Sequence, residues 1–388
     1  MAPLRERVLQ FLHATVEEGQ KSAGQLLREV QMTFDNLSGA QWQLVREIVS
    51  QFPTRNVPGA GAEREREHED EGDDGLDTAL GETFCSYNPG LVGVGNPHPA
   101  FVDICATLAS IPQPACTYKA GLPTEVMCRR LSQLQLETVL MACQRFQGLL
   151  PDGSRQGFFL GDGAGMGKGR QIGGLLYELL LREHRKAVWF SASSGLHYDA
   201  ERDIGDLGAL KYMKLHRLDQ YGYGDLPMDS GVLFSTYTML VSVSSDGTSR
   251  LDQIVDWLGE DFEGLLVFDE AHKAKNGEYI NRKNKLVKGT ITAAAVFELQ
   301  RRLSKARVVY VSATAVTEPH HLAYMPRLGL WGQGASLKDF PALLKMCSQG
   351  GVGAMEILCM EMKMRGMFLS SPTATLRRPR SSKSRCST

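Results

Sequence analysis

The residues that most suggest chemistry form a glycine-rich stretch with one lysine. The stretch reads Gly157-Phe-Phe-Leu-Gly-Asp-Gly-Ala-Gly-Met-Gly-Lys-Gly-Arg170, so an apolar run leads into closely spaced glycines and then Lys168. Glycines allow backbone N–H groups to converge on phosphate oxygens without a Cβ in the way, and a helix that starts there directs its positive end at the same anion. Lys168 would add a mobile charge for the terminal phosphates. The stretch therefore predicts a phosphate-binding loop.

The match to the phosphate-loop consensus G-x-x-x-x-G-K-[ST] is incomplete at two positions. Asp162 stands where the first glycine is expected, and Gly169 stands where a hydroxyl side chain would touch Mg²⁺. A glycine-rich turn between a strand and a helix can also form without a ligand, so the loop alone leaves that alternative open. The residues to which we assign nucleotide contacts are Gly163, Ala164, Gly165, Met166, Gly167, Lys168, Gly169 and Arg170.

Two carboxylates follow a second apolar run, in Gly264-Leu-Leu-Val-Phe-Asp-Glu-Ala-His272. Ligands of open α/β sheets bind at the carboxyl ends of the strands, where this pair would lie. We expect Asp269 to hold Mg²⁺ through water and Glu270 to orient and deprotonate the attacking water. His272 would couple the nucleotide to the nucleic-acid side. An isolated Asp-Glu pair is often only solvated, and the phosphate loop upstream is what favours the functional interpretation.

A third apolar run, Arg307-Val-Val-Tyr-Val-Ser-Ala-Thr314, ends in small hydroxyl side chains. We expect Ser312 and Thr314 to hydrogen-bond the acidic pair and to transmit the state of the nucleotide. By itself this is an ordinary strand end. The three patterns in this order and spacing are far more specific than any one of them.

The elements that must position these residues alternate along the chain from about residue 82 to residue 370. Short apolar runs alternate with amphipathic stretches such as 172–182 and 293–303. Strands that are almost wholly apolar indicate a parallel sheet covered on both faces by helices, which is an α/β fold. The strands that we expect are 157–160, 187–191, 232–237, 265–268 and 308–312.

The flanking segments differ in composition from this central part. Residues 1–52 show helical spacing of apolar side chains and predict a helical N-terminal segment. Residues 53–80 are Pro/Gly-rich and acidic, which predicts a disordered linker, and 81–369 form the globular lobe. The basic stretch 370–388 reads as a disordered tail that is either a nuclear-import or nucleic-acid patch or simply solvated.

The composition limits the classes of protein to which this chain could belong. A chain of 388 residues that is 43% hydrophobic can bury a sizeable core, and a net charge of −1 gives no overall basic surface, so nucleic acid would need a local patch. None of the eight cysteines forms a C-x-x-C pair or a zinc spacing, which predicts reduced thiols in an intracellular protein. We find no apolar stretch of about 18 residues and no signal peptide, so we expect no membrane insertion and no secretion.

The three motifs resemble motifs I, II and III of superfamily 2 helicases, the second in its DEAH form, and longer segments resemble the Strawberry-notch family. That family also has glycine after the loop lysine, so the departures at Asp162 and Gly169 become family features. The resemblance covers roughly residues 82–369. The segments that carry it are Leu131–Glu137, Gly161–Arg170, Trp189–Ser193, Tyr198–Asp203, Phe268–Asn276, Tyr310–Thr314, Glu318–Pro319 and Ala323–Gly332.

The resemblance implies a RecA-like lobe of an ATP-dependent, helicase-like protein that uses ATP and Mg²⁺. By likeness to the helicase Q motif, Gln135 is a candidate adenine reader. Eukaryotic members are nuclear regulators of transcription, so DNA or chromatin-associated proteins are the expected partners. Family members continue into a second lobe that completes the ATPase, whereas the match here stops near residues 367–369. The alternative is a single-lobe module that binds nucleotide or protein without appreciable ATPase or unwinding activity.

Overall fold

A computed structural model describes the central part of the chain. The described residues are 84–86, 94–99, 103–163, 165–271, 279–280, 286–287, 290–312 and 319–369. They belong to one compact unit, Ala79–Thr388. The predictions for 1–52, 53–80 and 370–388, and those for Ala164, His272 and Thr314, lie outside the described residues.

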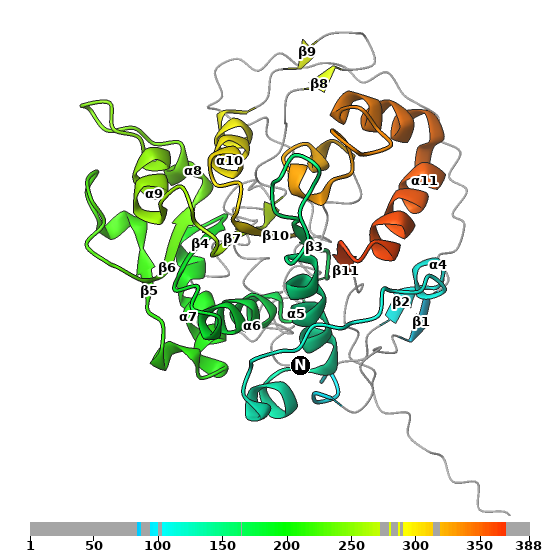
Figure 1. Cartoon of the computed structure of the whole chain (residues 1–388), viewed down its shortest axis with the longest axis horizontal. Coiled ribbons are helices and arrows are strands. Elements are labelled where there is room, and N and C mark those ends of the chain that lie inside the picture. The colour runs from blue at the N-terminus through cyan, green and yellow to red at the C-terminus, as the bar shows by residue number, and fades with distance from the viewer. Residues whose placement is uncertain are drawn as a thin grey trace, which may run out of the picture. The chain divides into compact units, whose positions relative to one another are not determined.

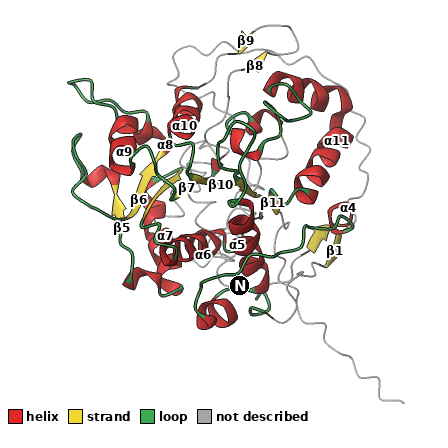
Figure 2. Cartoon of the chain, in the orientation of Figure 1, coloured by secondary structure: helices red, strands yellow, loops and turns green. Residues whose placement is uncertain are grey.

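The main sheet of the described residues has seven strands and is parallel throughout (Figures 1 and 2). Its order is β11-β3-β10-β7-β4-β6-β5. The strands are β3 (Phe158–Leu160), β4 (Lys186–Ser191), β5 (Leu215–Arg217), β6 (Gly231–Thr236), β7 (Leu265–Asp269), β10 (Arg307–Val311) and β11 (Phe368–Leu369). This arrangement confirms the α/β fold class with a parallel sheet covered by helices, as the apolar runs predict.

Helices cover both faces of this sheet. One face carries α5 (Gln133–Arg145), α6 (Lys168–Leu181) and α7 (His197–Asp206). The other carries α8 (Tyr237–Leu240), α9 (Arg250–Leu258), α10 (Ile291–Arg302) and α11 (Phe340–Met364). In Figure 1 the first group lies below the strands β4 and β7, and α8–α10 lie above them.

The strands separate two apolar cores because their side chains alternate between the faces. In β3, Phe158 and Leu160 join the core under α5, α6 and α7, whereas Phe159 joins the core under α8 to α11. All three side chains are fully buried. Strands buried on both faces need apolar residues at every position, which explains why they read as continuous apolar runs in the sequence.

The remaining described elements are short. They are β1 (Phe84–Ser86) and β2 (Asp103–Cys105), which pair antiparallel, α4 (Ala106–Ala109), and the antiparallel pair β8 (Tyr279–Ile280) and β9 (Leu286–Val287). Single turns of helix are η1 (Val126–Arg130), η2 (Ser194–Leu196), η3 (Ala209–Lys211), η4 (Leu218–Gln220), η6 (Pro319–Leu322) and η7 (Pro326–Leu328). Within the described part of the chain, no helix combines the length and apolar character that crossing a membrane requires.

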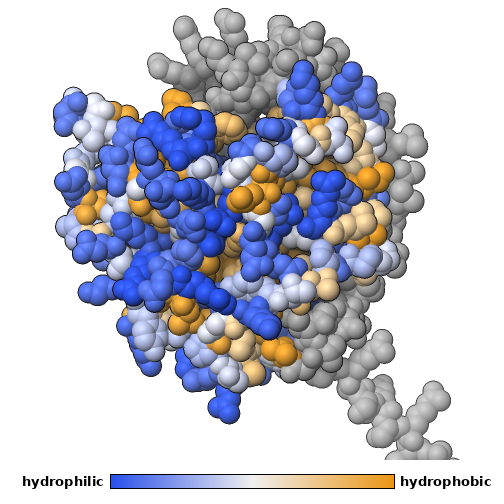
Figure 3. Space-filling model, viewed as in Figure 1, coloured by the Kyte–Doolittle hydropathy of each residue, from blue (hydrophilic) through white to orange (hydrophobic). Residues whose placement is uncertain are grey.

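The surface of the lobe is predominantly polar on the face in Figure 3, where hydrophobic residues emerge in small groups between hydrophilic ones. The most exposed large hydrophobic side chains are Ile291 on α10 and Ile357 on α11, together with Tyr198 on α7. Scattered apolar residues of this kind are normal for a folded protein.

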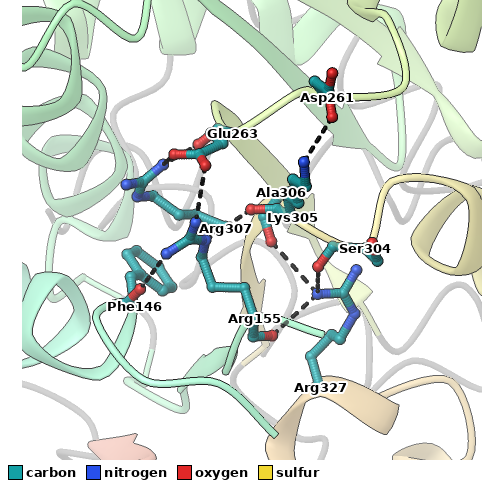
Figure 4. A network of polar contacts seen from close by, with 9 residues as sticks. All are labelled: Phe146, Arg155, Asp261, Glu263, Ser304, Lys305, Ala306, Arg307 and Arg327. Carbon is teal, nitrogen blue, oxygen red and sulfur yellow. Dashed lines mark hydrogen bonds and ion pairs between the residues drawn. The ribbon is translucent and has the colours of Figure 1, made fainter. Parts of the chain in front are cut away.

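Arginine side chains organise the amino edge of the sheet, opposite the edge that carries the phosphate loop (Figure 4). Arg327 is only 3% exposed, and its guanidinium donates to the carbonyls of Gln300 and Leu303 at 2.7 Å, at the end of α10. It also donates to Ser304 at 2.8 Å and to Arg155 at 3.0 Å. One planar group with five N–H donors thus serves several buried carbonyls, and it ties α10 to the segment before β3.

Replacing Arg327 with methionine is therefore expected to lower the free energy of unfolding by at least about 3 kcal/mol. The stem would still pack, but the carbonyls of Gln300 and Arg155 would lose their donor, at about 1–3 kcal/mol each, while those of Leu303 and Ser304 would keep one backbone donor. Urea unfolding followed by circular dichroism measures the change. Arg301→Met is the matched control, since Arg301 is an exposed arginine of α10 that pairs with Glu298. Equal stability of the two variants would contradict the role assigned to Arg327.

Candidate functional site

The phosphate loop joins β3 to α6, as the glycine-rich stretch predicts. Gly165 and Gly167 have φ angles of 83° and 73°, in the left-handed region that favours glycine. A Cβ at Gly165 would meet none of the described atoms within 4 Å, whereas one at Gly167 would collide with Gln135 Nε2. The loop therefore favours glycine at both positions for its backbone shape, and at Gly167 also because Gln135 leaves no room for a Cβ. Open space beside a glycine turn of this kind suits a bound phosphate.

Lys168 is the first residue of α6, directly above the loop. Its Nζ donates to the carbonyls of Asp162 and Gly163, both at 3.1 Å, so the charge is held over the loop backbone. The N-cap residue Gly167 offers no side-chain cap to the helix. An uncapped helix N-terminus and a lysine at the same loop both favour an anion there.

Asp162, which replaces the first consensus glycine, points into the protein behind the loop. It is 1% exposed, and its Oδ2 accepts a hydrogen bond of 2.8 Å from Gln171 Nε2 on α6. The side chain thus fastens the start of the loop to the helix that follows. This residue was noted in the sequence only as a departure, because nothing in the linear pattern shows a buried partner nine residues away.

Asp269 lies at the same edge of the sheet as the loop. It is the last residue of β7 and pairs with Val311 of β10, and Val311 also pairs with Leu160, the last residue of β3. Adjacent strands lie about 4.8 Å apart, so the acidic strand end and the start of the loop are about 10 Å apart at one level. Lys168 lies close enough for its charge to lower the pKa of Asp269. The register thus brings together the two groups that must share one ligand.

The Asp269 carboxylate is held by neighbours from β4 and from its own turn. Its Oδ2 accepts from Trp189 Nε1 at 3.3 Å and from Ser191 Oγ at 3.5 Å, while its Oδ1 accepts from the N–H of Glu270 at 2.9 Å. Burial raises the pKa of Asp269 to about 6, with a further contribution from the charge of Glu270. A nearby cation would favour the charged form of this carboxylate.

Glu270 occupies an unusual backbone conformation. Its φ is 48°, in the left-handed region, which costs about 1–2 kcal/mol for a residue with a Cβ. The preceding carbonyl, that of Asp269, accepts a hydrogen bond of 2.8 Å from the buried Tyr237 hydroxyl. Strain of this kind persists where the surroundings hold it, and it is common at functional sites. The turn thus places Asp269 and Glu270 in succession at the carboxyl end of β7.

Trp189, Ser191 and Tyr237 are site residues to which sequence reasoning assigned no role. Trp189 and Ser191 lie in a segment that carries the family resemblance, but only the pairing of β4 with β7 places them beside Asp269. Tyr237 follows β6, two strands from β7. A hydrogen bond across strands that are distant in the sequence leaves no local pattern.

Three other predicted residues lie near the loop without contacts that test their roles. Gln135 is 5% exposed, its Nε2 donates to the Met166 carbonyl at 3.1 Å, and its Oε1 accepts from the Ser132 N–H at 3.0 Å. Arg170 pairs with Asp206. Ser312 is buried, and its N–H donates to the Leu160 carbonyl at 3.0 Å. The adenine, phosphate and coupling roles of these residues stay predictions.

A metal would find few protein ligands at this site. Among the described residues, no group of three or more His, Cys, Asp or Glu side chains could hold an ion. Mg²⁺ at nucleotide sites is held by one or two carboxylates with phosphates and water, and Asp269 alone meets that need. The donor set therefore fits a magnesium ion that arrives with the nucleotide.

Comparison with known proteins agrees with this geometry. A family model described as "P-loop containing NTP hydrolase pore-1" matches residues 97–373. Protein strawberry notch homolog 1 of Rattus norvegicus is 43% identical over 328 residues, which are 82% of this chain and 25% of that protein. Protein strawberry notch of Drosophila melanogaster is 46% identical over 302 residues, 75% of this chain and 18% of that one. Protein FORGETTER 1 of Arabidopsis thaliana is 43% identical over 317 residues, 79% and 23% of the two chains.

The chain spans about a quarter or less of the length of these relatives. Among solved structures, the Sulfolobus solfataricus SWI2/SNF2 ATPase core in complex with dsDNA is similar over 62% of this chain and 44% of that one, with 16% identity and a TM-score of 0.43. The family model spans the phosphate loop and the acidic strand end together. The chain therefore belongs to the Strawberry notch family of P-loop NTP hydrolases.

Proposed function

We propose that the chain binds ATP with Mg²⁺ and forms the nucleotide-binding lobe of a helicase-like regulator of transcription that acts on DNA or chromatin in the nucleus. The observation that carries the nucleotide part is the register of the sheet. Val311 pairs with both Leu160 and Asp269, so the start of the phosphate loop and the acidic strand end lie at one edge of the sheet, which supports a shared ligand. The transcriptional and nuclear part rests on the family alone.

The residues take distinct parts in this proposal. The loop N–H groups and the start of α6 bind the phosphates, and Lys168 exchanges its two carbonyl contacts for phosphate oxygens. Trp189 and Ser191 hold Asp269 in the orientation in which it contacts the hydrated metal. Glu270 accepts a proton from the attacking water. When bound, Mg²⁺ neutralises charge on the phosphates.

A second candidate is a module that binds nucleotide or protein with little turnover. The described residues place Lys168 beside the acidic pair, whereas phosphoryl transfer in NTPases also draws on an arginine supplied by another part of the protein or by a partner. That cation is worth about 10³–10⁵ in rate. The observation behind this candidate is that Lys168 lies near Asp269 in the described residues, and a lysine there can bind nucleotide without the arginine that fast turnover needs.

Two measurements on the full chain separate these functions. Binding of a fluorescent ATP analogue with Mg²⁺ tests the nucleotide site, and release of phosphate with and without duplex DNA tests turnover. The helicase-like function and the nucleotide-binding module both require that the analogue binds saturably and that unlabelled ATP displaces it. Hydrolysis stimulated by DNA supports the helicase-like function, and binding without hydrolysis supports the module. A chain that takes up no nucleotide would refute the proposal.

DNA binding is tested separately by the anisotropy of a labelled duplex at two salt concentrations. Contacts to the phosphate backbone release counterions, so the affinity is expected to fall steeply as salt rises. An affinity that does not depend on salt, or no binding at low salt, would argue against a nucleic-acid partner for this lobe.

A further inference from the structure

The glycine that replaces the consensus hydroxyl lies against a carboxylate. Gly169 is the second residue of α6, and α6 packs there against α7. A Cβ at Gly169 would lie 2.9 Å from Asp203 Cγ and closer still to Asp203 Oδ2, distances that real Cβ atoms do not show. The Asp203 carboxylate thus occupies the volume into which a side chain at position 169 would extend.

This volume has a defined chemical use in other phosphate loops. The Ser or Thr after the loop lysine places its hydroxyl on the Mg²⁺ of the bound nucleotide. Here the loop offers no hydroxyl at that position, and an oxygen from α7 takes the space instead. A carboxylate is a ligand that Mg²⁺ accepts, either directly or through a bound water.

We propose that Asp203 replaces the missing hydroxyl, so that its Oδ2, beside Gly169, contacts the Mg²⁺ of the bound nucleotide or a water on that ion. This inference rests on the proposed nucleotide site and adds a metal-binding residue to it. Asp203 is part of α7, which follows β4, and β4 also supplies the Trp189 and Ser191 side chains that hold Asp269. One strand–helix unit would thus organise both carboxylates of the metal.

The local contacts leave this carboxylate oxygen available. Asp203 Oδ1 is 3.5 Å from Arg202 Nη2, but Oδ2 accepts no hydrogen bond from any residue that the structure describes. The side chain is 19% exposed. Burial raises the pKa of Asp203, whereas the charges of Arg202 and Arg170 and the N-terminus of α6 favour the ionised carboxylate.

A purely structural alternative exists, in which Asp203 only fills the space over Gly169. The two roles differ in their dependence on Mg²⁺, since a space-filling side chain affects nucleotide binding equally with and without metal. Affinity for a fluorescent ATP analogue is therefore measured in a Mg²⁺ titration and again in EDTA, on the full chain. Asp203→Asn keeps the shape and removes the charge. Asp199→Asn, an exposed acid on the same helix, is the matched control.

For Asp203→Asn we expect the Mg²⁺ concentration that half-saturates the tight complex to rise about tenfold to a hundredfold. Affinity in EDTA should stay at the wild-type value, and Asp199→Asn should match the wild type in both conditions. Loss of affinity by the same factor with and without Mg²⁺ would assign Asp203 a structural role and overturn the proposal. An unchanged Mg²⁺ requirement would overturn it as well.

A paired substitution gives an independent test. Gly169→Ser alone should impair binding, because the new Cβ collides with Asp203. Combining it with Asp203→Ala clears the space and restores the consensus hydroxyl, so the double variant should need less Mg²⁺ than Asp203→Ala alone. If the hydroxyl gives no such recovery, the inference is wrong although the nucleotide site stands. If the wild-type chain binds no nucleotide, the proposed function fails and this inference fails with it.

Discussion

Replacing Lys168 with alanine is expected to weaken ATP binding about tenfold to a hundredfold. The side chain would lose a charge-assisted hydrogen bond to phosphate, which contributes about 1.5–3 kcal/mol. Its Nζ already lies over the loop, 3.1 Å from the carbonyls of Asp162 and Gly163, so little reorganisation precedes the contact. Calorimetric titration with ATP and Mg²⁺ measures the change.

Lys211→Ala is the control for this experiment, because Lys211 is an exposed lysine of the same lobe, in the single turn η3. Thermal unfolding of both variants checks that the lobe remains folded. If Lys168→Ala bound ATP as tightly as the wild type, the phosphate-binding role assigned to Lys168 would be wrong.

The second large effect is expected for Glu270→Gln, which should abolish ATP hydrolysis while leaving ATP binding within about threefold of the wild type. Glutamine fits the same left-handed turn at φ 48° but cannot accept the proton from water. General-base catalysis contributes about 10²–10⁴-fold to such rates. Single-turnover hydrolysis with DNA present is the measurement, and Glu260→Gln, an exposed acid, is the control.

The Glu270→Gln variant distinguishes a role of the acidic pair in binding nucleotide from a role in activating water. Equal rates for the wild type and Glu270→Gln would mean that Glu270 is not the base. Tighter retention of ATP by the variant, with no phosphate release, would match a site that binds and orients nucleotide but no longer activates water. Rates indistinguishable from background in both proteins would favour the binding module.

Much of the fold could be predicted from the sequence because buried parallel strands leave continuous apolar runs. All five expected strands are present, and each differs from its expected bounds by one residue at most at either end. The strands of the main sheet that were missed are β5 and β11. The former reads Leu215-His-Arg217 with partly exposed side chains, and the latter has two residues, so neither carries a run long enough to recognise.

The site was predicted only as far as its local motifs extend. The loop, Asp269 and Glu270 lie in segments whose order along the chain signals their roles. Asp203 and Tyr237 act through contacts with residues 34 and 32 positions away, and those contacts depend on which helices and strands become neighbours. Gly169 is an example. The sequence shows only that it departs from the phosphate-loop consensus, whereas the packing of α7 against α6 shows that Asp203 occupies the space of the missing side chain.

The position of β10 between β3 and β7 has a consequence for the interpretation of mutants. This strand contributes no reacting group. Its residue Val311 nevertheless pairs with the last residue of β3 and the last residue of β7, so it aligns the loop and the acidic turn along the strand direction. Val308 and Val309 are both fully buried. A substitution that displaces either side chain would move the phosphate loop and the acidic turn apart, although it changes no residue of the loop or of the turn. Such a variant would resemble an active-site knockout in every assay of nucleotide chemistry, and only its unfolding curve would identify it as a packing defect.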